Sequence, residues 1–143
     1  MKRKGFTVLE LLVALALIAG VLSAGFFSGR SWAQRERAEG FVPVFAASFW
    51  IGATEAAARG RQLRLEATPD ALLLYQGTKV LRRWPIPPGF SVHPDGPLAR
   101  FSPPGEVKDP NGNDLNAPLV FTLTTPSGTK TATVSVIGEV KVE

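Results

Sequence analysis

The residue with the clearest chemical consequence in this sequence is Glu10, which lies inside an apolar run near the amino terminus. Between Phe6 and Phe27 the only polar side chains are Thr7, Glu10 and Ser23. An unpaired carboxylate in hydrocarbon costs at least roughly 2.5–3.5 kcal/mol on insertion scales. A helix of this stretch would reach about 33 Å, enough to cross a bilayer core. The run therefore predicts a membrane segment, and the carboxylate inside it is either a tolerated cost or a group with a specific partner.

Other candidates for catalysis or metal binding are few. The chain has no cysteine, and its only histidine, His93, stands in a turn-like context before Pro94. No serine–histidine–aspartate arrangement, phosphate-binding glycine loop or paired-carboxylate motif is recognisable. We therefore expect no enzyme, no catalytic residue and no cofactor.

Residues 109–114 partly match a calcium loop, because oxygen-bearing side chains occupy positions 109, 111 and 113. Asp114 stands where such a loop needs glycine, and Val120 replaces the bidentate glutamate. The Asp-Pro and Asn-Gly pairs favour a plain turn, so we expect no metal site.

Four arginines, Arg61, Arg64, Arg82 and Arg83, are candidate DNA contacts if the first strands pair and gather them into one basic patch. The overall charge does not favour this partner. Three of the 16 basic residues lie in the first five positions, which leaves 13 against 12 acidic residues in the rest of the chain. DNA binding is thus an alternative and not the favoured reading.

Three interpretations compete for residues 1–27. The first is a cleaved secretory signal with a site near Ser23-Ala24-Gly25, but the apolar run is long for one. The second is a plain membrane anchor whose basic end stays cytoplasmic, which leaves Glu10 unexplained. The third rests on the stretch 4–10, KGFTVLE, preceded by basic residues and followed by the apolar run.

That stretch closely resembles the leader junction of type IV pilins and of the pseudopilins of type II secretion. The resemblance implies that residues 1–5 are a leader, that prepilin peptidase cuts between Gly5 and Phe6, and that the new amine of Phe6 is N-methylated. Glu10 is then the fifth residue of the mature chain. The amine and the carboxylate lie about one helical turn apart, and pairing relieves the cost of burying either. A pair formed between subunits would make Glu10 a register device in assembly.

The helix is expected to run from Phe6 to Arg59, with 6–27 as the membrane span and filament core and Gly60 as its C-cap. Gly40 and Pro43 should bend or loosen it. One face of its second half follows a spacing of three and four residues suited to burial: Phe41, Val44, Phe45, Ser48, Phe49, Gly52 and Ala56.

After Gly60 the period changes to two, which predicts an antiparallel β-domain over 60–143. The expected strands are 61–66, a hairpin of 71–76 and 78–84 around Gly77, 90–93, 99–102, 119–125, 130–137 and 139–142. The fold class is therefore α+β, a long N-terminal α-helix packed on a C-terminal antiparallel β-sheet domain, as in the type IV pilin fold.

Two further stretches narrow the resemblance. Residues 52–65, GATEAAARGRQLRL, look like the helix end and first strand of FimT/GspH-type minor pilins and pseudopilins. The tail adds 101–105, FSPPG, and 138–142, GEVKV, although a basic C-terminal strand of DNA-binding members is interrupted here by Glu139 and Glu143.

The resemblance implies a minor pilin or pseudopilin, a structural subunit of a type IV pilus or a type II secretion pseudopilus. Its partners would be other pilin or pseudopilin subunits, prepilin peptidase and the inner-membrane assembly platform. It would wait in the inner membrane as a single-pass protein with a periplasmic C-terminal domain, and then join the filament. The alternative is a DNA-binding minor pilin of a competence pilus. A plain membrane-anchored binding domain is a third reading.

Overall fold

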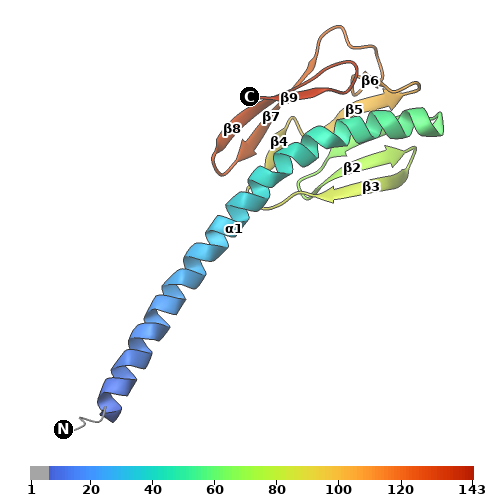
Figure 1. Cartoon of the computed structure of the whole chain (residues 1–143). Coiled ribbons are helices and arrows are strands. Elements are labelled where there is room, and N and C mark those ends of the chain that lie inside the picture. Colours follow the sequence, from blue (N-terminus) through green and yellow to red (C-terminus); the bar gives the residue numbers. More distant parts are fainter. Residues whose placement is uncertain (1–6) are drawn as a thin grey trace. The chain divides into compact units, whose positions relative to one another are not determined.

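The computed structural model describes residues 7–143, apart from the side chains of residues 26–28. It consists of one long helix followed by nine strands (Figure 1). The elements are α1 (Val8–Arg59), β1 (Leu63–Ala67), β2 (Ala71–Gln76), β3 (Lys79–Pro85), β4 (Ser91–His93), β5 (Gly96–Ser102), β6 (Glu106–Lys108), β7 (Leu119–Thr125), β8 (Gly128–Val134) and β9 (Val140–Val142). The predicted α+β class, a long apolar N-terminal helix packed on antiparallel sheets, is confirmed.

Two compact units divide the chain, residues 1–33 and residues 34–143. The described residues of the first unit form the start of α1, a helix long and apolar enough to cross a membrane by length and composition. The second unit contains the rest of α1 and both sheets. One sheet has the strand order β3-β2-β1-β5-β6 and the other the order β4-β7-β8-β9, with every pair antiparallel.

The core of the second unit forms where one face of α1 meets both sheets (Figure 1). Phe49 packs 6.2 Å from Phe101 of β5 and 5.7 Å from Phe121 of β7, measured between ring centroids, so a single side chain joins the two sheets. Gly52 lies under the Phe101 ring, where a Cβ would stand 2.3 Å from the nearest ring carbon. The predicted buried face is confirmed, except that Val44 is only partly buried.

The helix ends where the sequence indicates. Gly60 has a φ of 60°, its N–H donates to the Ala57 carbonyl at 3.3 Å, and the Arg61 N–H donates to the Ala56 carbonyl at 3.3 Å. This is the Schellman pattern, which satisfies the last carbonyls of a helix. The helix is continuous through Gly40 and Pro43.

The C-terminal strands differ from the expectation in one place. The strand expected over 130–137 ends at Val134, and Val136 and Ile137 are 46% and 68% exposed. A turn takes over because Gly138 donates to the Ser135 carbonyl at 3.0 Å, and this turn starts β9. The short strand β6 was not expected from the sequence, since Val107 is its only buried residue.

An ion pair fastens the β7–β8 turn to α1. The Lys130 ammonium lies 2.7 Å from a carboxylate oxygen of Glu39, and the Ser127 hydroxyl donates to the other oxygen. Hydrogen bonds from Lys130, and then from Ser127, lower the pKa of Glu39 to about 2.

Candidate assembly surface

The start of α1 is capped by Thr7. The Glu10 N–H donates to the Thr7 hydroxyl oxygen at 3.3 Å, and the Leu11 N–H donates to the Thr7 carbonyl at 3.2 Å. Glu10 therefore occupies the first helical turn, where a negative charge is favoured by the helix dipole. The role of Thr7 escaped the sequence reasoning, although Thr-x-x-Glu before an apolar run is the pattern of a capping box. The predicted processing residues, Gly5 and Phe6, lie outside the described residues.

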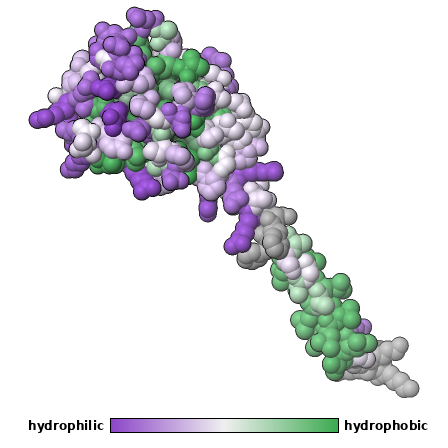
Figure 2. All heavy atoms as spheres, turned by 180° about the vertical axis from the view of Figure 1, so that it is seen from behind, coloured by the Kyte–Doolittle hydropathy of each residue, from purple (hydrophilic) through white to green (hydrophobic). Residues whose placement is uncertain are grey.

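The first unit presents its apolar side chains outward. Every large apolar side chain described there is more than half exposed, from Val13 at 53% to Val8 at 76%. Figure 2 shows hydrophobic side chains, in green, over most of the coloured surface of the lower helix on the face in view. Exposed apolar area of this extent marks a surface that hydrocarbon or other apolar helices cover.

The second half of α1 has an outward face with unusual composition. Residues 40–54 contain no charged residue. The exposed positions there follow a spacing of three and four residues and so share one face: Gly40, Pro43, Ala47, Trp50 and Thr54. A helix face in water usually carries charged and polar side chains. This uncharged face is therefore suited to contact with another apolar surface.

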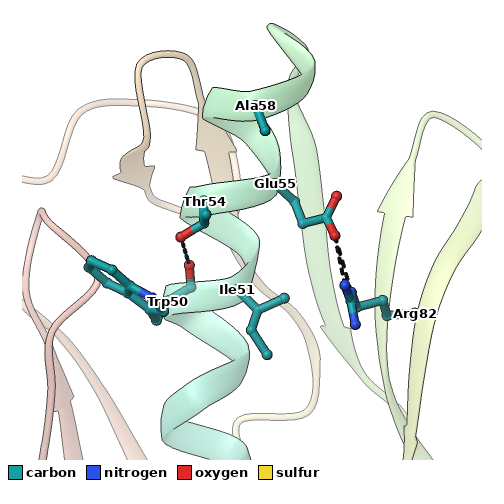
Figure 3. Close-up of a pocket in the computed structure, with 6 residues that line it drawn as sticks. All are labelled: Trp50, Ile51, Thr54, Glu55, Ala58 and Arg82. Atoms are coloured by element: carbon teal, nitrogen blue, oxygen red, sulfur yellow. Dashed lines mark hydrogen bonds and ion pairs between the residues drawn. The ribbon is translucent and has the colours of Figure 1, made fainter.

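Trp50 stands on that face, 64% exposed, between two open grooves. One groove, of about 320 Å³, is shown in Figure 3 and is lined by Trp50, Ile51, Thr54, Glu55, Ala58 and Arg82. The other, of about 470 Å³, is lined by Ala46, Ala47, Trp50, Ile137, Gly138, Glu139 and Val140. The exposed side chains of Val136 and Ile137 extend the apolar area near the second groove. Sequence reasoning did not single out Trp50, because an aromatic residue beside a buried face is usually taken as core.

Glu55 closes the polar side of the first groove. Its carboxylate binds Arg59 at 2.7 Å and Arg82 of β3 at 2.8 Å (Figure 3 draws the Arg82 contact). Hydrogen bonds from Arg59, and then from Arg82, lower the pKa of Glu55. The only carboxylate that lines the groove is therefore already paired, and its cluster with two arginines keeps a net positive charge.

The four candidate DNA contacts are not gathered into one patch. Arg82 binds Glu55 on the helix-facing side of the sheet, and the next residue, Arg83, points to the opposite face because strand side chains alternate. Arg64 lies 3.3 Å from Glu66 and its guanidinium covers the Tyr75 ring at 4.9 Å. Arg61 is exposed just after the helix cap.

The loop at residues 109–114, which partly matches a calcium loop in sequence, is held by its own hydrogen bonds. The Asp109 carboxylate accepts the Asn113 N–H at 2.8 Å and the Asn113 side-chain amide at 3.0 Å, which lowers the pKa of Asp109. Asp114 is paired with Lys108. Within residues 7–143 no three His, Cys, Asp or Glu side chains gather as a metal site would require. His93 is exposed at the end of β4 and not in a turn, opposite Thr122 of β7.

Comparison with known proteins matches residues 1–26 to the family described as the prokaryotic N-terminal methylation motif. No curated protein and no solved structure matches the chain significantly. The motif supports a type IV pilin-like protein, a substrate of prepilin peptidase that assembles with other pilins in a membrane. It suggests a structural subunit and not an enzyme, and together with the apolar start of α1 it fits anchoring in the inner membrane.

Proposed function

We propose that this chain is a minor pilin or pseudopilin of the FimT/GspH-like kind, a subunit of a type IV pilus or of a type II secretion pseudopilus. Prepilin peptidase removes residues 1–5 and the amine of Phe6 is methylated. The subunit waits in the inner membrane with residues 60–143 in the periplasm, and the platform then moves it into the filament. The methylation motif over residues 1–26 is the support for processing.

The observation that carries the assembly role is the outward surface of α1. Its first unit exposes large apolar side chains, and residues 40–54 of its second half carry no charge although one face is open. Exposing either surface to water is unfavourable, because removing apolar area from water stabilises a structure by about 25 cal/mol per Å². Packing against neighbouring helices would bury both. The first turn would then bring Glu10 to the methylated amine of a neighbouring subunit, where the two charges neutralise each other.

Because the chain contains no cysteine, single introduced thiols test this directly. Leu15→Cys and Ala47→Cys probe the two surfaces, and Lys141→Cys, on the exposed side of β9, is the matched control. We expect maleimide to label all three in detergent, but only the control in isolated filaments. Equal labelling of all three in filaments would contradict assembly through α1. The other subunits of the filament that retains the chain then show whether it belongs to a type IV pilus or to a type II secretion system.

Service as a DNA receptor of a competence pilus is the second candidate, and it carries a separate test. Changing Arg61, Arg64, Arg82 and Arg83 to Glu should abolish DNA binding if these residues contact phosphates, and the affinity of the unchanged chain should fall steeply with salt. We expect weak binding at physiological salt, since residues 6–143 carry 13 basic against 12 acidic side chains and Arg82 is already paired with Glu55. Submicromolar, salt-sensitive binding that the four substitutions remove would put this function first.

A further inference from the structure

The five-stranded sheet carries a row of cationic side chains on the face turned away from α1. Arg64 of β1 stands opposite Arg100 of β5, and Arg100 stands opposite Lys108 of β6. The neighbours of Arg64 along β1, Leu63 and Leu65, are buried, so alternation places Arg64 on the other face. Like charges directly opposite one another destabilise a sheet. An anion placed between these side chains would relieve that repulsion.

The three cations are neutralised unequally. Lys108 pairs with Asp114, and Arg64 Nη2 lies 3.3 Å from a Glu66 carboxylate oxygen. Arg100 Nε donates to the backbone carbonyl of Pro110 at 3.0 Å, and no described carboxylate forms an ion pair with Arg100. The terminal nitrogens of Arg100 therefore keep a full positive charge without a protein anion.

A cavity of about 120 Å³ lies beside these residues, lined by Gln62, Leu63, Arg64, Tyr75, Gly77 and Arg100. Its polar lining offers two guanidinium groups, a side-chain amide and a phenol hydroxyl, and it contains no carboxylate. The Arg64 guanidinium rests on the Tyr75 ring, which fixes its plane, and its Nε is buried without a hydrogen-bond partner in the described structure. The cavity has the size for one compact oxyanion.

The loop 109–113 fixes the second arginine. Hydrogen bonds from Asn113 to the Asp109 carboxylate close the loop, and the Pro110 carbonyl then holds Arg100 Nε. Gly112 faces the same side chain, and a Cβ there would lie 3.5 Å from Arg100 Cδ. The planar fork of Arg100 is thus positioned before any ligand arrives, which reduces the entropy lost on binding.

We propose that this cavity binds a phosphate group, either free or carried by a larger molecule, between the guanidinium groups of Arg64 and Arg100. Arginine forks match phosphate oxygens bidentately, and charge-assisted hydrogen bonds of this kind are about twice as strong as neutral ones. Gln62 and Tyr75 would donate to the remaining oxygens. The site lies on the sheet face opposite α1, so it is independent of the assembly surface.

The test uses the whole chain in a maltoside detergent, which has no phosphate headgroup. Inorganic phosphate is titrated by calorimetry against chloride at equal ionic strength, and a thymidine decanucleotide is titrated separately. We expect saturable phosphate binding with a dissociation constant on the order of 1 mM. Tighter oligonucleotide binding at the same residues would identify nucleic acid as the source of the phosphate, and phosphate binding alone would identify a free anion.

Matched variants decide whether the cavity is the site. Arg100→Gln should weaken binding at least about tenfold, since the phosphate loses a charge-assisted hydrogen bond and a full positive charge. Gln62→Ala, which keeps both charges, should weaken it less and guards against a folding defect in the first variant. Arg83→Gln, on the same sheet but outside the cavity lining, should bind normally. Absence of binding to both probes, or equal losses for Arg83→Gln and Arg100→Gln, would overturn the proposal.

Discussion

In the first part of α1, residues 8–33, the large apolar side chains whose exposure is described all lie open, whereas in residues 34–59 Phe41, Phe45 and Phe49 are buried against the sheets. Both parts are rich in apolar residues, so composition alone does not separate them. The second part begins with three exposed charged residues, Arg35, Glu36 and Arg37. After them its three phenylalanines lie on one buried face, and Trp50 lies outside that face. In the first part, residues 11–22 carry only apolar side chains and glycine, so that stretch is apolar on every side.

The difference shows where the stabilising partner of each part comes from. A helix that is apolar all round is stable only inside a protein core or a membrane. The second part finds that core within its own chain, in the two sheets that contact Phe49. Substitutions in the first part should therefore change processing and assembly and leave domain stability alone, and inward substitutions in the second part should do the reverse.

The largest expected effect concerns the leader. Gly5→Val should leave the precursor uncut, because a branched side chain obstructs the scissile bond. Gly25→Val is the matched control, since it alters the competing signal-peptidase site and not the pilin junction. Intact mass of protein from cells that contain prepilin peptidase measures the result: wild type and Gly25→Val should lose residues 1–5 and gain one methyl group. A chain cut near Gly25, or a normally processed Gly5→Val, would contradict the prediction.

The next effect concerns Glu10. Glu10→Val should insert into the membrane at least as well as wild type, because a charge is removed from the apolar run. Its retention in filaments should fall by at least about tenfold, since leaving one partner of a buried pair uncompensated costs about 3–5 kcal/mol. Immunoblots of membrane and sheared filament fractions measure both. Glu36→Val, at an exposed carboxylate of the second unit, is the control. Wild-type retention of the Glu10 variant would remove its register role.

Two helical glycines test the comparison most directly. A Cβ at Gly52 meets the Phe101 ring, whereas a Cβ at Gly20 meets nothing within 4 Å. Gly52→Ala should destabilise the domain by about 1–3 kcal/mol, as overpacked cores do, in spite of the better helix propensity of alanine. Gly20→Ala should leave domain stability unchanged. Urea unfolding in detergent, followed by tryptophan fluorescence, measures the difference. Equal midpoints for the two variants would show that the Phe101 contact has no energetic weight.

The fold followed from the sequence where a period was long. The inward face of α1, the hairpin around Gly77 and the alternation of 119–125 were all readable, because many residues repeat one pattern. The strand β6 was missed, since three residues with a single buried side chain show no period. The strand expected over 130–137 is too long at its C-terminal end. The turn at Ser135 depends on backbone hydrogen bonds that strand propensity does not reveal.

The candidate sites were less accessible to sequence reasoning. Because strand side chains alternate, the sequence alone places Arg82 and Arg83 on opposite faces of the sheet. It does not reveal the partner of Arg82, since Glu55 lies 27 residues earlier on α1. The meeting of Arg64 with Arg100 needs the β1–β5 pairing, which joins segments far apart in the chain. Thr7 is the exception, since its capping pattern, Thr-x-x-Glu, is local and can be recognised in the sequence.

The smallest expected effect is a pH dependence in the second unit. Hydrogen bonds from Lys130, and then Ser127, hold the pKa of Glu39 at about 2, below its ordinary value of 4.5. A carboxyl group with a lowered folded-state pKa contributes its stability above the unfolded pKa. That contribution is lost as the pH falls from about 4.5 towards 2. The urea midpoint should therefore drop over this range. In Glu39→Gln the drop should be shallower, because the slope of unfolding free energy against pH loses the contribution of the one proton that Glu39 binds.

Glu39→Gln is compared with Glu55→Gln, because Glu55 also has a lowered pKa but binds Arg59 and Arg82 at the other end of the domain. Both variants should reduce the loss of stability at low pH. Their effects should add in the double variant, because the two carboxylates have no shared partner. Salt should weaken both contributions, since neither carboxylate is deeply buried and exposed pairs are screened. An acid-induced loss of stability that is the same in the wild type, Glu39→Gln and Glu55→Gln would contradict the assignment of this pH dependence to the second part of α1.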